Sequence, residues 1–277
     1  MKKCWSTVLL SAVLLLGLSV LLYPAFAQWW TGRHQSRVIA AYDRAVAQID
    51  SRRCEELRCA ARAYNRALAE RNGGFVLTAA QRREYEALLN MKDDGMMGYV
   101  EIPAVNCSLP IYHGADESVL QRAVGHLEWS GLPVGGESSH CVISGHCGLP
   151  GARLFTDLER LEDGDLFRLR VLDEVLTYEV DQIRVVLPDE TEALHMEPGQ
   201  DYCTLVTCTP YGINSHRLLV RGRRVENREE AALAPPDAAD TKALPWLLPG
   251  VAAALSLPAV LLWCRRSKTG GEGCEDR

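Results

Sequence analysis

The sequence predicts a mainly β protein: a closed β-barrel of seven to eight strands with short helices, an N-terminal helical segment and a transmembrane helix at each end. Three observations predict it: short apolar runs separated by turns after Met96, amphipathic periodicity before them, and long apolar stretches near both termini. The 277 residues are 47% apolar and 24% charged, which suits one main domain with an appendage. The formal charge of −6 and the lack of basic runs interleaved with aromatic residues give no support to nucleic-acid binding.

Residues 1–27 read as a membrane anchor or signal segment. Lys2 and Lys3 precede the apolar run Val8–Tyr23, the order of charges found in export signals and anchors. The following Ala25-Phe26-Ala27 fits a signal-peptidase site, so a cleaved signal peptide and an uncleaved anchor both stay open. In either case the middle of the chain is exported.

Residues 244–264 are apolar and are followed by a basic stretch, the pattern of a C-terminal transmembrane helix with a cytoplasmic tail at 265–277. The alternative is a buried hydrophobic tail, which leaves the basic residues that follow this stretch unexplained. Residues 227–243, rich in Ala, Pro and Asp, form the expected linker to the membrane. We therefore expect a cell-membrane protein with its main domain outside the cell and, if the N-terminal segment is uncleaved, both termini in the cytoplasm.

Residues 28–94 are expected to be helical. Apolar residues three and four apart predict an amphipathic helix over 37–70, broken near Asp50. Thr78, with Gln81 three residues on, predicts a capping box for a second helix that runs through Leu89. A movable lid is one interpretation of this region, and a helical layer packed on the barrel is the one we favour for the long helix.

Residues 95–226 carry the strand pattern of the barrel. The expected strands, bounded by turn signals, are Gly98–Ile102, Leu109–Tyr112, Cys141–Ser144, Asp165–Leu172, Val175–Val186, Tyr202–Cys208 and Arg217–Val220. A short helix is expected near 152–158.

The candidate site consists of Cys208 at the end of one strand, Arg217 at the start of the next, and His146 in a glycine-containing loop after a third. A thiol attacks a carbonyl as thiolate, so it needs a basic or cationic neighbour, which His146 supplies. Negative charge on the tetrahedral intermediate needs fixed donors, and a guanidinium offers several. These are the parts of a thiol acyl-transfer site, and no cofactor is expected.

The strings TLVTCTPYGINSHRLLVRG and HCGLPGARLF resemble the sortases, most closely class C, the pilin-polymerising sortases of Gram-positive bacteria. The resemblance covers roughly residues 95–224. It implies a sortase β-barrel in which Cys208 is the nucleophile, His146 the general acid and base, and Arg217 the cation that stabilises the transition state. It also favours an uncleaved N-terminal anchor.

Neighbouring residues have lesser expected roles. Thr207 and Thr209 are expected to support the site or bind substrate, although Thr207 equally fits plain strand packing. Among the other histidines, His126 and His216 are the nearest rivals of His146, and His113 and His195 are expected to be surface residues. We expect Arg221, Arg223 and Arg224 to pair with surface carboxylates.

Cys141 and Cys203 each stand five residues before a site residue, so adjacent parallel strands would bring them level. This gives a disulfide hypothesis, with two unpaired packing cysteines as the favoured alternative. A zinc site built from Cys141, His146, Cys147, Cys203 and Cys208 is disfavoured because the chain has no Cys-x-x-Cys pair. Cys54 and Cys59 are expected on different faces of one helix and poorly placed to pair.

The resemblance implies a membrane-anchored cysteine transpeptidase that cleaves the Thr-Gly bond of an LPxTG-like sorting signal and joins the thioester to a lysine amine of a pilin subunit. Its expected partners are pilin or surface proteins with such signals, and the membrane. The alternatives are a cysteine hydrolase or a cell-wall-anchoring sortase of the same fold, or a non-catalytic membrane scaffold. Class C sortases commonly carry an Asp-Pro-aromatic lid, but this chain has no Asp-Pro pair. Phe75 stands where a lid would lie, and we predict a looser lid or none.

Overall fold

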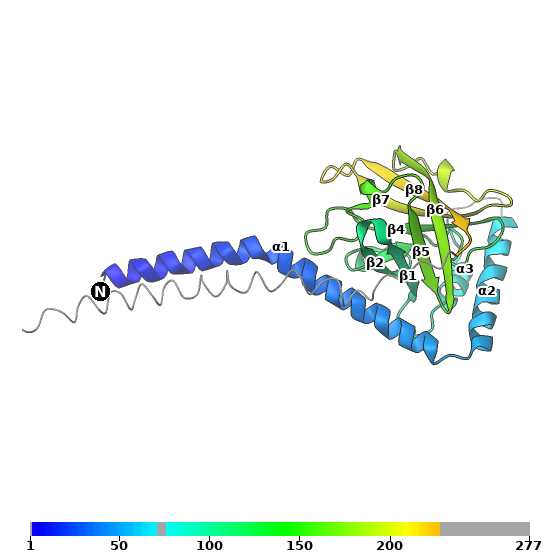
Figure 1. Cartoon of the computed structure of the whole chain (residues 1–277), viewed down its shortest axis with the longest axis horizontal. Helices are drawn as coiled ribbons and strands as arrows, with labels where there is room; N and C mark the ends of the chain where they lie inside the picture. The colour runs from blue at the N-terminus through cyan, green and yellow to red at the C-terminus, as the bar shows by residue number, and fades with distance from the viewer. Residues whose placement is uncertain (1, 71–75, 228–277) are drawn as a thin grey trace, which may run out of the picture. The chain divides into compact units, whose positions relative to one another are not determined.

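The computed structural model describes residues 2–70 and 76–227, and its centre is a closed barrel of eight strands. Around the barrel the strands follow the order β1-β2-β3-β4-β7-β8-β6-β5. The pairs β2–β3 and β4–β7 are parallel, and the other neighbouring pairs are antiparallel. The strands are β1 (Met96–Ile102), β2 (Cys107–His113), β3 (Val124–His126), β4 (Ser139–Ser144), β5 (Leu166–Val171), β6 (Glu174–Val186), β7 (Asp201–Thr209) and β8 (His216–Val225). The predicted mainly β barrel is confirmed (Figure 1).

The helices before the barrel follow the predicted break. Helix α1 (Lys2–Ala47) continues through Pro24, the chain turns before Asp50, and α2 (Ser51–Glu70) follows. The predicted amphipathic helix is therefore divided near Asp50 as expected, while its first half is continuous with the apolar N-terminal segment. Helix α3 (Ala79–Ala87) begins at the predicted capping box, in which Thr78 and Gln81 each accept a hydrogen bond from the other's backbone N–H.

The helix expected near 152–158 is not formed, and this prediction is wrong. The chain makes turns there, with Leu154 at φ +40°, and only a single 3-10 turn, η2 (Leu158–Arg160), follows. The positive φ of Leu154 interrupts any helix at this point. The remaining short elements are η1 (Pro103–Val105), α4 (Glu117–Leu120) and η3 (Glu192–Leu194).

One helix within the described residues is long and apolar enough to cross a membrane, the segment Ala12–Ala47 of α1. Its large apolar side chains, such as Leu14, Leu16 and Leu21, are more than half exposed. This supports the predicted N-terminal span by length and composition. The predicted linker, C-terminal transmembrane helix (244–264) and tail, and the expected lid residue Phe75, lie outside the described residues.

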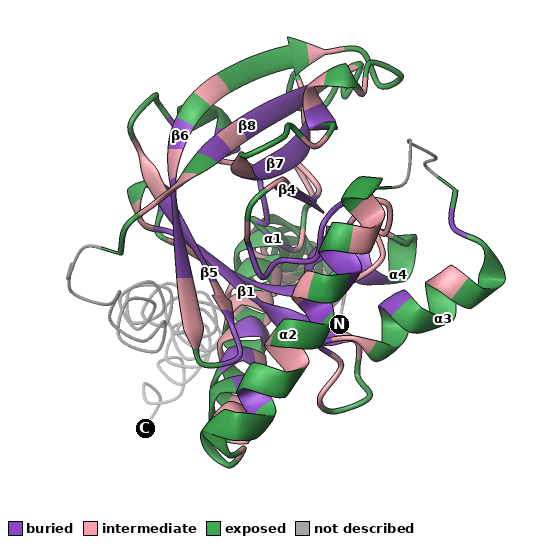
Figure 2. Cartoon of the chain, turned by 90° about the vertical axis from the view of Figure 1, so that its right-hand side faces the viewer, coloured by how far each residue is buried: buried purple, intermediate pink, exposed green. Residues whose placement is uncertain are grey.

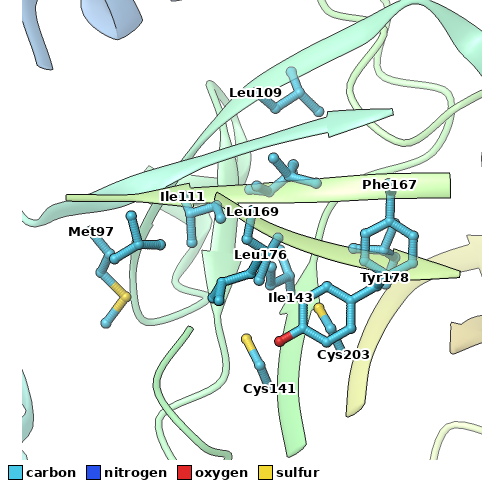
Figure 3. Packing of buried hydrophobic residues seen from close by; sticks show 14 of the residues in the cluster. Met97, Leu109, Ile111, Cys141, Ile143, Phe167, Leu169, Leu176, Tyr178 and Cys203 are labelled. Carbon is cyan, nitrogen blue, oxygen red and sulfur yellow. The ribbon is translucent and has the colours of Figure 1, made fainter. Parts of the chain in front are cut away.

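The barrel interior is closely packed, and Figure 2 shows its strands rich in buried residues. The rings of Phe167 and Tyr178 stack with centroids 5.6 Å apart, and Cys141 and Cys203 lie among the same side chains (Figure 3). Outside the barrel, Tyr42 of α1 donates a hydrogen bond to the Met97 carbonyl at 2.9 Å. This part of α1, together with α2, forms a layer packed against the barrel, which is the arrangement predicted for the long helix in preference to a lid.

Candidate active site

The register of β7 and β8 places Cys208 and Arg217 side by side. The two residues are Cα partners in the antiparallel pair, and directly opposed residues point to the same face of a sheet. Side chains alternate along β7, so Cys203 and Leu205 enter the central core while Val206 belongs to a separate cluster on the other face. By the same alternation Cys208 and Arg217 lie on the outer face, where both are half-buried near the ends of their strands.

His146 is brought to this point by the parallel pairing of β4 with β7. Ser144 is level with Val206, and the next backbone N–H, that of Gly145, donates to the Val206 carbonyl at 3.0 Å. The Thr207 hydroxyl donates in turn to the Gly145 carbonyl at 2.8 Å. These two hydrogen bonds fasten the start of the His146 loop to the residues immediately before Cys208. The side chain of Thr207 is buried, so it holds the loop from the side that faces the protein interior.

Close packing fixes the rest of this loop. A Cβ atom on Gly145 would lie 2.7 Å from the Phe155 ring, so no side chain fits there. Gly148 has φ +75°, a conformation that favours glycine, and the ring of Tyr211 from the β7–β8 loop packs against it. The loop therefore contacts both its own barrel end and the loop that follows Cys208.

Cys147, next to His146, is half-buried, and burial raises the pKa of its thiol. The neighbouring Glu159, Cys208 and Asp157 raise this pKa further. Because a raised pKa keeps the thiol protonated at neutral pH, Cys147 is a poor nucleophile.

Arg217 has a different environment from the arginine four residues later on the same strand. Its Nη1 donates to the backbone carbonyls of Asn214 and His216, at 3.3 and 3.1 Å, and no carboxylate among the described residues pairs with it. Arg221, by contrast, forms a two-pronged ion pair with Asp181, as predicted for a surface arginine. The guanidinium of Arg217 thus keeps donors available for a substrate oxygen.

Of the other histidines, two make contacts that hold the fold together and one is exposed. His126 is fully buried, with Nδ1 2.9 Å from the Tyr85 hydroxyl and Nε2 2.7 Å from the Gly131 carbonyl. The expectation that His113 is a surface residue is wrong: it is half-buried against the end of α3, its Nε2 lies 2.8 Å from the Leu88 carbonyl, and burial lowers its pKa. His195 is exposed, as expected.

Cys141 and Cys203 are Cα partners in the β4–β7 pair, so the predicted level position is confirmed. Both thiols are free and fully enclosed, and burial raises the pKa of Cys203 well above its usual range. Cys203 and Cys208 point to opposite faces of β7, which separates the cysteines of the zinc alternative. In the part of the chain that the structure describes, no three His, Cys, Asp or Glu side chains are placed to hold a metal ion. Cys54 is buried and Cys59 is exposed, on different faces as expected, and neither is paired.

One neighbour of the site escaped prediction from sequence. The Oε2 atom of Glu117, in α4, lies 3.7 Å from Nε2 of His146. A single glutamate in a one-turn helix carries no motif, and only the parallel β2–β3 crossover brings it here. Thr209, expected to support the site, pairs with His216, one position beyond Cys208 and on the opposite face by alternation.

Comparisons with known proteins match the part of the chain that forms the barrel. A family model described as the sortase domain matches residues 100–225. Sortase D of Bacillus subtilis is 33% identical over 131 residues, which are 46% of this chain and 63% of that protein. Sortase A of Streptococcus agalactiae is 32% identical over 117 residues, 41% of this chain and 47% of that protein. The chain thus spans between about half and two thirds of the length of these relatives.

Solved structures match more completely. Sortase C1 from Streptococcus agalactiae is similar with a TM-score of 0.68 and 46% identity, covering 69% of this chain and 100% of that one. Sortase C of Streptococcus pneumoniae gives a TM-score of 0.63 and 45% identity over 69% and 97% of the two chains. Sortase C of Clostridium perfringens, solved with the C-terminal cell wall sorting motif, gives 0.61 and 40% over 69% and 99%.

Proposed function

The chain belongs to the sortase family of cysteine transpeptidases, with class C sortases among its structural relatives, and from this premise we propose that it joins surface proteins through a thioester on Cys208. The substrate is a protein with an LPxTG-like sorting signal, cleaved between Thr and Gly, and the acceptor is a lysine amine of a pilin subunit. The observation that carries the proposal is the direct pairing of Cys208 with Arg217 beside the loop of His146.

In the first half-reaction the Cys208 thiolate adds to the threonine carbonyl carbon. The oxygen that becomes negative accepts hydrogen bonds from the Arg217 guanidinium, whose charge is permanent. When the C–N bond breaks, His146 gives its proton to the departing glycine amine, and the threonyl group remains on sulfur as a thioester.

In the second half-reaction the acceptor amine attacks the thioester. His146, now neutral, takes a proton from the incoming amine, sulfur leaves as thiolate, and an isopeptide bond remains. The cycle ends with the thiolate and imidazolium with which it began. Thr207 contributes by holding the His146 loop against β7, since its hydroxyl is committed to the Gly145 carbonyl.

The same proposal places the enzyme at the cell membrane. The exposed apolar part of α1 serves as the N-terminal anchor, and residues 244–264 serve as the C-terminal one, with the barrel outside the cell and both termini inside. Anchoring confines the enzyme to the membrane surface, which raises the effective concentration at the site of any sorting signal carried by a protein on the same membrane.

The proposed partners follow from the relatives. The Clostridium perfringens enzyme was solved with its sorting motif, and the structure of the pneumococcal enzyme is described as giving insight into pilin substrate specificity. We extend both properties to this chain as the substrate class it takes. With no Asp-Pro pair in the sequence, a lid around Phe75 is expected to be loose or absent, which leaves Cys208 open to the sorting signal.

The test is to trap the acyl-enzyme on the full chain in detergent micelles with an LPxTG-containing peptide, and to identify the fragment on Cys208 by mass spectrometry. A purified pilin subunit with its reactive lysine is then added. We expect covalent ladders that disappear with a Lys→Arg pilin. Release of acid without ladders would indicate a hydrolase, transfer to a cell-wall amine would indicate an anchoring sortase, and absence of any adduct would contradict the proposal.

A further inference from the structure

The loop between β2 and β3 contains α4, a single helical turn whose first residue is Glu117. The Oε2 atom of Glu117 lies 3.7 Å from Nε2 of His146, within ion-pair distance but longer than a direct hydrogen bond. Its other oxygen, Oε1, accepts a hydrogen bond from the side-chain amide of Gln121, one turn further along the chain. One carboxylate oxygen of Glu117 is therefore held by Gln121, and the other lies near the imidazole of His146.

This pairing is selective within the described residues. Glu117 has no lysine or arginine partner there, and the imidazole of His146 is the only basic group within ion-pair distance of it. The Nδ1 atom of His146 makes no hydrogen bond to any described residue, so that nitrogen remains available to a substrate. The two ring nitrogens thus differ, because Nε2 lies near a carboxylate and Nδ1 has no hydrogen-bond partner among the described residues.

We infer that Glu117 is a positioning residue that orients the imidazole of His146 during the thioester cycle. The inference rests on the proposed function, in which His146 alternates between imidazole and imidazolium. An anion beside Nε2 favours the ring orientation that leaves Nδ1 toward the reacting groups. Glu117 touches neither substrate nor the reacting atoms, so it acts through His146.

The chain offers a matched control. Asp116 precedes Glu117 at the start of the same helical turn, is exposed, and makes no side-chain capping hydrogen bond. The variant Asp116→Asn removes one negative charge from the same place without touching the His146 contact. Glu117→Gln removes the charge at the contact with the same side-chain length, and Glu117→Asp restores a carboxylate on a shorter side chain.

The experiment measures steady-state transpeptidation by the full chain in detergent micelles, with an LPxTG-containing peptide and an amine acceptor. We expect Glu117→Gln to lower kcat by about three- to fivefold with KM unchanged, as befits a largely exposed charge, and Glu117→Asp to recover part of the loss. Asp116→Asn should stay within about twofold of the unchanged enzyme. Equal effects of Glu117→Gln and Asp116→Asn would overturn the inference.

A second measurement separates this inference from the proposed function. Nitrogen-15 NMR of selectively labelled histidine reports the protonation and tautomer of each ring nitrogen of His146 without any substrate. Glu117→Gln should shift these signals and Asp116→Asn should not. If the peptide is never cleaved, the proposed function fails while the NMR result still decides the role of Glu117, and unchanged signals in Glu117→Gln reject that role.

Discussion

Two groups of cysteine and histidine lie on neighbouring strands of this barrel, and we propose a catalytic role for only one of them. Inside, Cys141 and Cys203 face each other near His126, all three fully buried. Outside, five residues further along the same β7 strand, Cys208 is half-buried beside Arg217.

The difference lies in access and charge rather than in residue type. Burial in an apolar interior raises the pKa of the Cys203 thiol, which makes it an inert packing group. The outer group adds a guanidinium without a carboxylate partner among the described residues and a histidine on a glycine-containing loop. A shift of one residue in β7 register would exchange the two faces, so strand register determines that Cys208, the proposed nucleophile, lies on the accessible face.

The largest expected effect separates the two cysteines of β7. Cys208→Ala should reduce acyl-enzyme formation at least about a thousandfold, because it removes the atom that carries the acyl group, with no change in unfolding midpoint. Cys203→Ala should do the reverse, with near-normal rates and a loss of about 1–2 kcal/mol in the free energy of unfolding, because it leaves a small cavity. Mass spectrometry of the adduct and denaturant titration measure the two properties. Near-normal adduct formation in Cys208→Ala would remove the basis of the comparison.

The next effect concerns the two arginines of β8. Arg217→Ala should lower kcat by about 100- to 1,000-fold, the loss typical of a donor to a developing oxyanion, and Arg217→Lys should recover only part because it lacks the planar fork. Arg221→Ala, which removes the ion pair with Asp181, should leave kcat within a few-fold. If both alanine variants slowed the reaction alike, Arg217 would have no special part in it.

The sequence sufficed for much of this site because strand ends and registers follow from local patterns. Cys208 and Arg217 stand on either side of a polar turn between two apolar runs, so an antiparallel pair had to bring them close. Equal offsets in β4 and β7 likewise predicted that Cys141 and Cys203 would be level, since parallel strands preserve spacing.

The features that the sequence did not predict depend on contacts between segments that are far apart in the chain. β3 has three residues, too few to show alternation, and Glu117 reaches His146 only because β3 pairs with β2 in parallel. The burial of His113 arises from the docking of α3, which its own neighbours do not reveal. A short helix was expected at 152–158, but every apolar residue there packs into the barrel end and Leu154 adopts a positive φ.

A smaller effect concerns the hydrogen bond that holds the His146 loop beside the strand of Cys208. Thr207→Val keeps the shape of the side chain but leaves the Gly145 carbonyl without its hydrogen bond, which should cost about 1–2 kcal/mol in unfolding free energy. Because the loop then moves relative to Cys208, kcat should fall by about three- to tenfold. Thr207→Ser retains the hydroxyl and serves as control. A Thr207→Val enzyme with lower stability but unchanged kcat would limit Thr207 to a structural role.

The smallest effect concerns the buried histidines, whose influence is on stability and depends on pH. His140 donates through Nδ1 to the His195 carbonyl at 2.9 Å, its Nε2 lies 2.7 Å from the Thr204 hydroxyl, and burial lowers its pKa. An unfolded histidine takes up a proton below about pH 6.5, whereas the buried one resists it, so stability is fully present above that pH and is lost as pH falls toward the lower folded pKa.

Replacing this ring should therefore flatten the pH dependence. In His140→Gln, the fall in unfolding free energy between pH 7.5 and 5.5 should be smaller than in the unchanged protein by up to about 1 kcal/mol, although the variant is less stable at pH 7.5. His113, whose pKa burial also lowers, contributes to the remaining slope in the same direction. Denaturant titrations of the full chain in micelles at several pH values measure this. A slope identical to that of the unchanged protein would mean that His140 protonates as readily in its buried position on the folded barrel as in the unfolded chain, and that its burial has no effect on its pKa.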